Sequence, residues 1–306
     1  MLTHLVIGSR GSPLALWQAG WARTTLLNAI PGLEVRIDVI RTRADREPDE
    51  PVARMGGKRV FTREIEEALL DGRIDLAVHS LKDMPTRLPG GLRLAATTRR
   101  WDVRDALVNC AGYNLENLPD GAVVGTGSPR RQAQVRHVRP DLNVEEIRGN
   151  VDTRLRKLDA GEVEAVVLAA AGLRRLGLAG RVSEFLPAER FLPAPGQGAL
   201  GIEIRHDDDR VAQAVRSLHD RSTHSAVTAE RAMLDELAGG CQMPVGAWAR
   251  LDEGGLVADG MVAAPDGGRV VRARTTGDPD ASTDVGRKLA KLLIEHGARQ
   301  ILRDVL

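Results

Sequence analysis

Short apolar runs rich in β-branched residues alternate with helical patterns through the first two-thirds of the chain, and this alternation constrains the fold most. Predicted strands cover residues 5–7, 35–40, 76–78, 92–96, 122–124, 144–147 and 165–168. Predicted helices cover residues 62–70, 130–139, 153–160 and 207–219, preceded by one that runs from a Ser12-Pro13 cap to Pro31. Strands that alternate with helices are typical of an α/β fold with mainly parallel sheets.

The last part of the chain has a different pattern, which begins after Gly239. Runs near residues 245–251, 256–262 and 269–275 flank two glycine-containing turns, which indicates an antiparallel meander. Apolar residues at helical spacing then predict a closing helix over residues 285–296. We therefore expect a smaller C-terminal α+β domain with a three-stranded antiparallel sheet.

Three stretches interrupt these patterns. Residues 97–104 and 192–198 lack the periodicity of a strand or helix and are rich in polar residues or in proline and glycine. Both stretches are therefore predicted to connect domains. Residues 41–54 are charged, contain proline and lack periodicity, which is typical of a mobile surface loop.

Composition narrows the possible partners. Of the 306 residues, 43 are basic and 42 are acidic, so neither nucleic acid nor a membrane surface is an expected partner. Two cysteines do not form a disulfide framework, and no window reaches the roughly 20 apolar residues of a membrane helix. No signal peptide is visible after Met1, so the cytoplasm is the expected location.

The segment from Val123 to Arg131 reads as a strand, a loop of small residues and a helix. Such a junction points backbone N–H groups and a helix N-terminus at one place, which suits an anion. Thr126 and Ser128 add hydroxyl donors, and Arg130 and Arg131 add charge. The segment matches neither a Walker loop nor a dinucleotide fingerprint. The alternative is an ordinary strand–helix turn with solvated arginines.

Two further strand-to-helix junctions carry arginine. Arg148 and Arg154 flank one of them, and Arg10 lies in the other, just before Ser12. Open α/β sheets bind ligands beyond the carboxyl ends of their strands, and arginine forks suit carboxylate or phosphate groups. The three junctions together predict a site for a polyanionic molecule.

An acid and a base follow the predicted strand at residues 76–78, since Lys82 and Asp83 stand just before Pro85. This is again the end of a strand, so Asp83 is a candidate catalytic carboxylate. The alternative is a surface ion pair that caps a turn. His79 is expected to pack or to form a local hydrogen bond, and the other histidines lack metal-ligand spacing, so no metal is predicted.

Cys241 lies in the turn Gly239-Gly240-Cys241-Gln242-Met243-Pro244 and is therefore expected to be accessible. It is a candidate nucleophile or covalent attachment point, and the alternative is an inert turn cysteine. A nucleophile would need a histidine base, for which His219 and His224 are available. Cys110 follows an apolar run and is expected to be packed.

Six motifs between about residues 7 and 246 resemble, in order and spacing, those of the porphobilinogen deaminase (hydroxymethylbilane synthase) family. They are Arg10-Gly11-Ser12-Pro13-Leu14-Ala15, His79-Ser80-Leu81-Lys82-Asp83-Met84-Pro85, Gly125-Thr126-Gly127-Ser128-Pro129-Arg130-Arg131, Arg148-Gly149-Asn150-Val151-Asp152-Thr153-Arg154, Leu192-Pro193-Ala194-Pro195-Gly196-Gln197-Gly198-Ala199 and Gly239-Gly240-Cys241-Gln242-Met243-Pro244. The resemblance implies a transferase that joins four porphobilinogen molecules head to tail, releases ammonia and hydrolyses off hydroxymethylbilane for tetrapyrrole (porphyrin, haem) biosynthesis.

The resemblance also implies a dipyrromethane cofactor, made from two porphobilinogens and attached through a thioether to Cys241. It assigns the catalytic role to Asp83, whose carboxylate would stabilise the positive charge left when ammonia departs. The residues implied to bind cofactor and substrate are Arg10, Ser12, Lys58, Ser80, Lys82, Thr126, Ser128, Arg130, Arg131, Arg148, Gly149, Arg154, Arg175 and Gln197.

The same resemblance implies three domains, and a monomer is expected because no oligomer interface is visible in the sequence. Two lobes like those of periplasmic binding proteins, residues 1–98 with 199–218 and residues 99–198, would flank a central cleft, into which residues 219–306 would present Cys241. Three positions depart from the family pattern: Gly127 stands where serine is usual, Ala44 where glycine is usual, and Arg59 where a small residue is usual.

Two other functions explain part of the pattern. A non-enzymatic clamshell protein that binds a polyanionic small molecule would account for the arginines, but it leaves Asp83 and Cys241 without a task. A cysteine hydrolase or acyltransferase would need a base beside Cys241.

Overall fold

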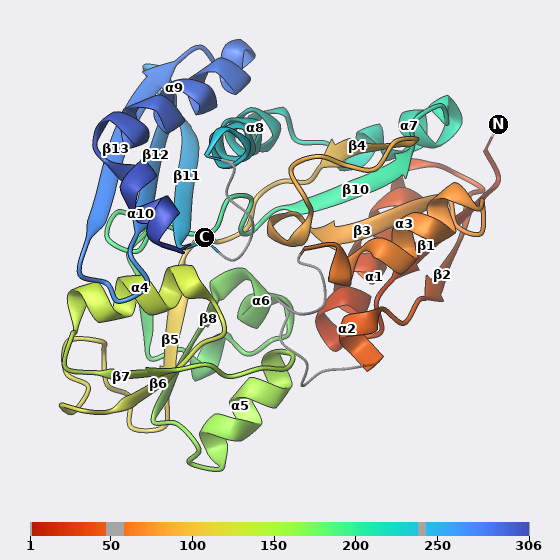
Figure 1. Ribbon diagram of the computed structural model, residues 1–306. Coiled ribbons are helices and arrows are strands. Elements are labelled where there is room, and N and C mark those ends of the chain that lie inside the picture. Colours follow the sequence, from red (N-terminus) through yellow and green to blue (C-terminus); the bar gives the residue numbers. More distant parts are fainter. Residues whose placement is uncertain (1, 47–57, 238–242, 306) are drawn as a thin grey trace. The chain divides into compact units, whose positions relative to one another are not determined.

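The structure is a computed structural model that describes residues 2–46, 58–237 and 243–305 (Figure 1). The chain forms two compact units: Met1–Trp101 with Gly198–His224, called unit 1, and Asp102–Gln197 with Ser225–Leu306, called unit 2. The strands of the described residues form two five-stranded sheets and one three-stranded sheet. This arrangement confirms the predicted class, an α/β fold with two sheet-rich lobes and a small antiparallel C-terminal part.

Unit 1 is built on a sheet with the strand order β2-β1-β3-β10-β4. Its strands are β1 (His4–Ser9), β2 (Glu34–Val39), β3 (Leu76–Ser80), β4 (Leu92–Thr97) and β10 (Leu200–Arg205). Its helices are α1 (Pro13–Ala29), α2 (Arg43–Arg46), α3 (Arg63–Leu70) and α7 (Asp209–Val215). The core is aliphatic: Leu5, Ile7, Leu26 and Ile202 pack together and are almost completely buried.

Unit 2 holds the second five-stranded sheet, in the order β7-β6-β8-β5-β9. Its strands are β5 (Asp105–Asn109), β6 (Val123–Gly125), β7 (Asn143–Glu145), β8 (Ala165–Ala169) and β9 (Glu184–Leu186). The helices α4 (Pro129–Val138), α5 (Val151–Asp159) and α6 (Ala170–Arg175) follow β6, β7 and β8 in turn. Successive residues of β5, Leu107 and Val108, enter different apolar clusters, so both faces of this sheet are covered.

The two five-stranded sheets share one topology. In each, three parallel strands are followed by an antiparallel strand, β10 or β5, and then by an edge strand. Because β10 and β5 run against the parallel strands, each of them begins where those strands end. Leu200 pairs with Ser80, and Asp105 pairs with Ala169. The residues that begin β10 and β5 therefore lie at the edge where ligands are expected.

The prediction of mainly parallel sheets was wrong in this respect, because β5, β9 and β10 were missed. β10 contains Gly201 and the fully buried Glu203, which break the apolar pattern of a strand. β9 has only three residues, and β5 begins with the charged Asp105. Neither a short run nor a run opened by a charge is recognised by periodicity.

The C-terminal part confirms the predicted antiparallel meander and closing helix. Its elements are β11 (Val245–Asp252), β12 (Gly255–Ala263), β13 (Val270–Gly277), α9 (Ser282–Glu295) and α10 (Ala298–Val305), preceded by α8 (Arg221–Glu236). Helices α8 and α10 were not predicted. Met261 and Ala263 of β12 pack against Ala133 and Leu192, so this part shares an apolar contact with the rest of unit 2.

The division into three domains stays a prediction. The chain passes between the two units after Trp101, after Gln197 and after His224. The first two passages fall inside the predicted connections, whereas the third lies within α8 (Arg221–Glu236). Two other expectations were wrong. Residues 43–46 of the predicted loop form α2, while residues 47–54 lie outside the described residues. Cys110 is exposed rather than packed, because β5 ends one residue before it.

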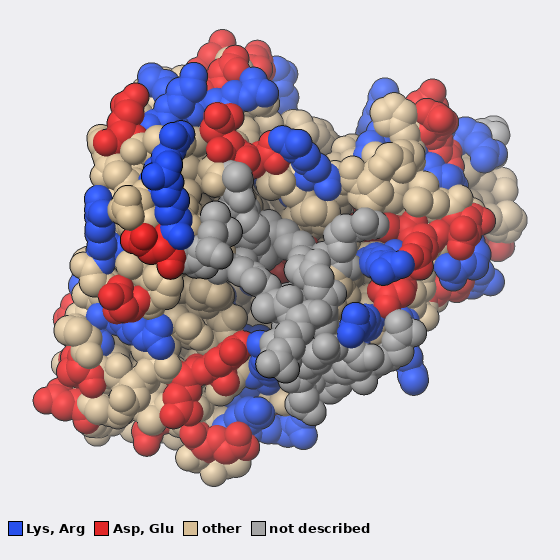
Figure 2. Space-filling model, in the orientation of Figure 1, with Lys and Arg blue, Asp and Glu red and all other residues tan. Residues whose placement is uncertain are grey.

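Charges of both signs are interspersed over the face drawn in Figure 2, as the net charge of +1 leads one to expect. No helix within the described ranges has both the length and the apolar character needed to cross a membrane.

Glu230 of α8 is a buried carboxylate that joins distant segments of unit 2. Its Oε2 accepts a hydrogen bond from Gly196 N at 2.7 Å, and its Oε1 accepts one from Ala249 N at 2.7 Å. Glu230→Gln turns one of these acceptors into a donor that faces a backbone N–H. We expect the free energy of unfolding, measured by urea denaturation, to fall by about 1–3 kcal/mol.

The matched control is Glu236→Gln, at an exposed position of the same helix. It should change the free energy of unfolding by less than about 0.5 kcal/mol. Equal stability of the two variants would contradict the role given to Glu230.

Candidate active site

Asp83 lies on a turn whose neighbours are fixed in the interior of unit 1. The turn is the 3-10 helix Leu81–Asp83, which follows β3 directly, and Asp83 itself is partly buried. Leu81 and Met84 are 1% exposed, and Leu81 N donates a hydrogen bond to Ala199 O at 3.0 Å. Gly201 of β10 makes room for this packing, since a Cβ there would lie 2.6 Å from Met84 Sδ. The Asp83 carboxylate is thus carried by a well-anchored backbone at the end of a strand.

The ends of β1 and β3 bring other predicted residues to the same edge, because these two strands are parallel neighbours. Ser12 caps α1 by accepting a hydrogen bond from Ala15 N at 3.3 Å, as expected. Ser80 Oγ accepts one from Gln18 Nε2 at 2.9 Å, which ties α1 to the end of β3. The partly buried Lys82 belongs to the same turn as Asp83.

Arg10 already has a carboxylate partner. Its Nη2 lies 2.5 Å from Asp45 Oδ1, and its guanidinium carbon lies 4.9 Å from the centre of the Phe61 ring. Thr42 donates to Asp45 Oδ2 from its N at 3.1 Å and from its Oγ1 at 2.8 Å. Burial alone would raise the pKa of Asp45, but the hydrogen bonds and charge of Arg10, helped by Thr42, hold that pKa below its ordinary value. Asp45 thus fixes Arg10 just after β1.

The β6–α4 junction of unit 2 is a capped helix start. Ser128 Oγ accepts a hydrogen bond from Arg131 N at 3.5 Å, and Thr126 Oγ1 accepts one from Ser128 N at 3.3 Å. Thr126 is completely buried. Both predicted hydroxyl groups therefore shape the turn itself.

The β7–α5 junction holds three more predicted residues. Gly149 has a φ of +103°, in the region that favours glycine, and its carbonyl accepts a hydrogen bond from Arg154 Nε at 2.9 Å. Arg148 forms an ion pair with Glu146. Because β6 and β7 are parallel neighbours, these residues share a sheet edge with the β6–α4 junction.

The two junctions are packed tightly at Gly127. A Cβ on this residue would lie 2.9 Å from Ile147 O and 3.8 Å from Arg154 Nη2. The position where the resemblance leads one to expect serine therefore has no room for a side chain, unless the β7–α5 backbone moves.

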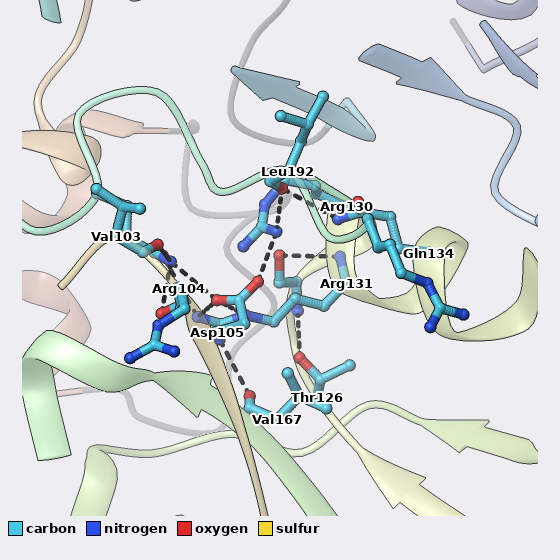
Figure 3. A network of polar contacts seen from close by, with 12 residues as sticks. Val103, Arg104, Asp105, Thr126, Arg130, Arg131, Gln134, Val167 and Leu192 are labelled. Carbon is cyan, nitrogen blue, oxygen red and sulfur yellow. Dashed lines mark hydrogen bonds and ion pairs between the residues drawn. The ribbon is translucent and has the colours of Figure 1, made fainter. Parts of the chain in front are cut away.

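Asp105, the first residue of β5, is the centre of a buried polar network (Figure 3). Its Oδ2 lies 2.7 Å from Arg130 Nη1. Its Oδ1 accepts hydrogen bonds from Arg131 Nε at 3.0 Å, Arg131 Nη2 at 2.8 Å and Gln197 Nε2 at 2.9 Å. Burial alone would raise the pKa of Asp105, but the charges and hydrogen bonds of Arg130 and Arg131 hold that pKa well below its ordinary value. The carboxylate is therefore ionised at neutral pH.

The remaining predicted arginine is also buried. Arg175 ends α6, which follows β8, and it is 6% exposed. Burial lowers the pKa of its guanidinium to about 10, so the group keeps its charge at neutral pH.

Two predicted site residues cannot be placed. Cys241 falls within residues 238–242, outside the described residues, and the side chain of Lys58 is not described either. The departures Ala44 and Arg59 have undescribed side chains as well.

Three histidines have hydrogen-bond partners in unit 1. His79 is buried, which confirms the expected packing. Its Nε2 lies 3.0 Å from Glu203 Oε2, 124 residues away, so this contact is not local in the sequence. His219 and His224 both approach Thr97, each through Nδ1 at 3.4 Å. Over the described part of the chain, no group of three or more His, Cys, Asp or Glu side chains is arranged to hold a metal ion.

Asp105 is the residue that sequence reasoning missed. A signal was present, because an aspartate directly precedes the apolar run 106–108. A carboxylate at the start of a buried strand must be paired, and the nearby arginines were the obvious partners. Asp105 was not singled out because β5, which it begins, was not predicted as a strand.

Asp105→Asn should lower the free energy of unfolding at pH 7 by about 3–5 kcal/mol, since it leaves two buried guanidinium groups without a counter-charge. This gap, the difference in free energy of unfolding between the wild type and Asp105→Asn, should depend on pH. The folded-state pKa of Asp105 is depressed, so its contribution is complete above the unfolded pKa of about 4 and is lost as the pH falls below that. Urea denaturation of both proteins between about pH 3 and pH 7 measures the gap.

Asp120→Asn is the control, because the side chain of Asp120 is 97% exposed. It should change stability by less than about 0.5 kcal/mol at every pH. A gap for Asp105→Asn that stays constant below about pH 4 would show that the carboxylate is not held ionised.

Comparison with known proteins covers almost the whole chain. The family model "Porphobilinogen deaminase, dipyromethane cofactor binding domain" matches residues 5–213, and the model "Porphobilinogen deaminase, C-terminal domain" matches residues 224–295. The porphobilinogen deaminase of Syntrophobacter fumaroxidans is 48% identical over 299 residues, which cover 98% of this chain and 97% of that protein. That of Pelobacter propionicus is 50% identical over 302 residues, covering 99% and 97%.

Among solved structures, the methionine binding protein MetQ covers 71% of this chain and 88% of that protein, with 15% identity and a TM-score of 0.46. A likeness at this level carries no argument. The family models and the two relatives do, because they extend over both units and through every motif of the candidate site. The chain belongs to the porphobilinogen deaminase family.

Proposed function

We propose that Asp83 is the catalytic carboxylate and Cys241 the cofactor attachment point with which this chain makes hydroxymethylbilane. The reaction follows from the family: four porphobilinogen molecules are joined head to tail with release of ammonia, for tetrapyrrole biosynthesis. The family model also makes dipyrromethane the cofactor. Family membership sets aside a clamshell protein that only binds its ligand and a cysteine hydrolase.

The buried charges of unit 2 fit a polycarboxylate such as dipyrromethane, each ring of which carries two carboxylates. The two guanidinium groups around Asp105 exceed its single charge. In addition, Nε of Arg130 is buried without a hydrogen-bond partner among the described residues. Buried cationic donors with spare capacity are what an anionic group requires.

We propose binding roles toward the cofactor and the substrate for residues of each unit. From unit 2 these are Thr126, Ser128, Arg130, Arg131, Arg148, Gly149, Arg154, Arg175 and Gln197, and from unit 1 Arg10, Ser12, Lys58, Ser80 and Lys82. When bound, the cofactor supplies the pyrrole carbon to which the first substrate is joined. The arginines direct carboxylates, and the hydroxyl groups, which cap the turns, set the direction of the neighbouring backbone.

The observation that carries the catalytic role is the anchoring of Asp83. Its turn is fixed by the buried Leu81 and Met84, so the carboxylate can stay at one point while positive charge develops on the substrate. From that point it can accept hydrogen bonds from pyrrole N–H groups and help to move a proton to the departing amine.

Asp83→Asn keeps the size of the side chain and removes its charge. We expect the fold to be retained, as measured by circular dichroism and thermal unfolding, and kcat to fall by at least about 100-fold. Asp71→Asn, at an exposed carboxylate of the same unit, should leave kcat unchanged. A kcat for Asp83→Asn close to that of the wild type would refute the catalytic role.

The covalent attachment is tested by the intact mass of the denatured protein. The wild type should carry an excess equal to two linked pyrrole units, and Cys241→Ser should lack it, because an alcohol is a much weaker nucleophile than a thiolate. Cys110→Ser should keep the excess, although Cys110 is exposed. A fully active wild type without added mass would exclude a covalent cofactor.

We also propose a cytoplasmic monomer whose only required partner is porphobilinogen. The balanced charge of the chain supports the exclusion of nucleic acid and membrane surfaces. The two cysteines, too few for a disulfide framework, support a reducing compartment.

A further inference from the structure

Asp105 occupies a special place in the topology of unit 2. It begins the antiparallel strand β5 and pairs with Ala169, the last residue of β8. Its carboxylate is therefore delivered to the edge at which β6, β7 and β8 end and the proposed binding residues begin. Asp105 is 0% exposed, so it acts only through the groups that it touches.

The contacts of Asp105 fix two guanidinium groups in different ways. Arg131 is held along one side, with Nε and Nη2 on Asp105 Oδ1 and Nη1 on Val167 O at 3.1 Å. Arg130 is held by one nitrogen, since Nη1 donates both to Asp105 and to Leu192 O, each at 2.7 Å. The opposite side of Arg130, formed by Nε and Nη2, has no hydrogen bond to any residue that the structure describes.

The free side of Arg130 has the geometry of a carboxylate receptor. Nε and Nη2 of a guanidinium point two parallel N–H bonds in one direction, which matches the two oxygens of a carboxylate. The network around Asp105 also retains one net positive charge, because one carboxylate faces two arginines. The two parallel N–H bonds of Arg130 and the net positive charge of the network can therefore together bind one carboxylate of a ligand.

Asp105 is itself held firmly from the preceding residues. Asp102 accepts hydrogen bonds from Arg104 N at 3.1 Å and Arg104 Nη2 at 2.8 Å, and it pairs with Arg174 at 3.2 Å. The guanidinium carbons of Arg104 and Arg174 lie 4.6 and 5.0 Å from the centre of the Phe185 ring. The start of β5 therefore cannot easily move away from the arginines of α4.

We infer that Asp105 is a positioning residue, which turns Arg130 so that its Nε and Nη2 face a carboxylate of the bound pyrrole chain. Arg131 is locked by the same carboxylate and supports this orientation. The inference rests on the proposed function, in which Arg130 and Arg131 hold carboxylates of the cofactor. A purely electrostatic role predicts the opposite effect of mutation, because removal of Asp105 raises the positive charge offered to an anion.

The test is the fraction of purified full-length chain that carries the two-ring adduct, read from intact mass after incubation with porphobilinogen. For Asp105→Asn we expect less than about a tenth of the wild-type fraction, because a guanidinium turned away from the ligand no longer points its two N–H bonds at the carboxylate. Loading equal to or greater than that of the wild type would overturn the inference. It would show that charge alone attracts the cofactor.

Two variants separate positioning from loss of stability. Asp102→Asn weakens the same segment without touching Arg130 or Arg131, so it should lower the thermal midpoint but load normally. Asp105→Glu keeps the charge and displaces it by one methylene, so intermediate loading is expected. Where Asp105→Asn does not fold, Asp105→Glu decides: wild-type loading and an unchanged KM for porphobilinogen overturn the inference.

Arg130→Gln distinguishes this inference from the proposed function beneath it. If Arg130→Gln loads as the wild type does, Arg130 does not hold the cofactor and its proposed binding role fails. If Arg130→Gln fails to load while Asp105→Asn loads normally, the binding role stands and only the positioning role of Asp105 is wrong.

Discussion

The ion pairs between Asp105 and the two arginines of α4 are the contacts on which the candidate site of unit 2 depends. Moving a carboxylate and a guanidinium out of water costs several kcal/mol for each ion, so buried pairs of this kind add little net stability. Their effect lies in geometry. Through Arg131 and Gln197 the same carboxylate is linked to Val167 of β8 and to Val103 in the connecting segment. One group therefore sets the mutual positions of β5, β8, α4 and the segment around Gln197.

The shared topology of the two five-stranded sheets explains why such groups occur where they do. An antiparallel strand inserted after three parallel ones must begin at the edge where those strands end. The residues that lead into β10 and β5 thereby reach the candidate sites. Ala199 anchors the turn that carries Asp83, and Asp105 orients the arginines. Both residues come directly after the predicted domain connections, residues 192–198 and 97–104. Gln197 and Leu192, which lie within the first of these connections, also bond the network around Asp105.

The sequence predicted structural features formed by residues close together in the chain, and it missed contacts between residues far apart in the chain. Caps at Ser12 and Ser128 and the strands before them are readable, because cap, helix and strand are close in the chain. β10 was hidden, because Gly201 is there to accommodate Met84 and Glu203 to meet His79, 124 residues away. Motifs likewise pointed to the arginines without revealing their carboxylate partners, since no spacing rule links Arg131 with Asp105.

The protein carboxylates that pair with the arginines help to explain how a site can both hold and release a polyanion. Of the six arginines proposed to bind carboxylates, at least four already face a carboxylate among the described residues: Arg10, Arg130, Arg131 and Arg148. Two unit charges 4 Å apart attract by about 4 kcal/mol near a protein surface, so several bare arginines would retain a product with many carboxylates very tightly. A guanidinium whose charge is partly compensated attracts less strongly but points in a fixed direction. The growing pyrrole chain gains two carboxylates with each ring and must finally leave the protein. Arginines that point in a fixed direction but attract it only moderately are therefore the more useful receptors.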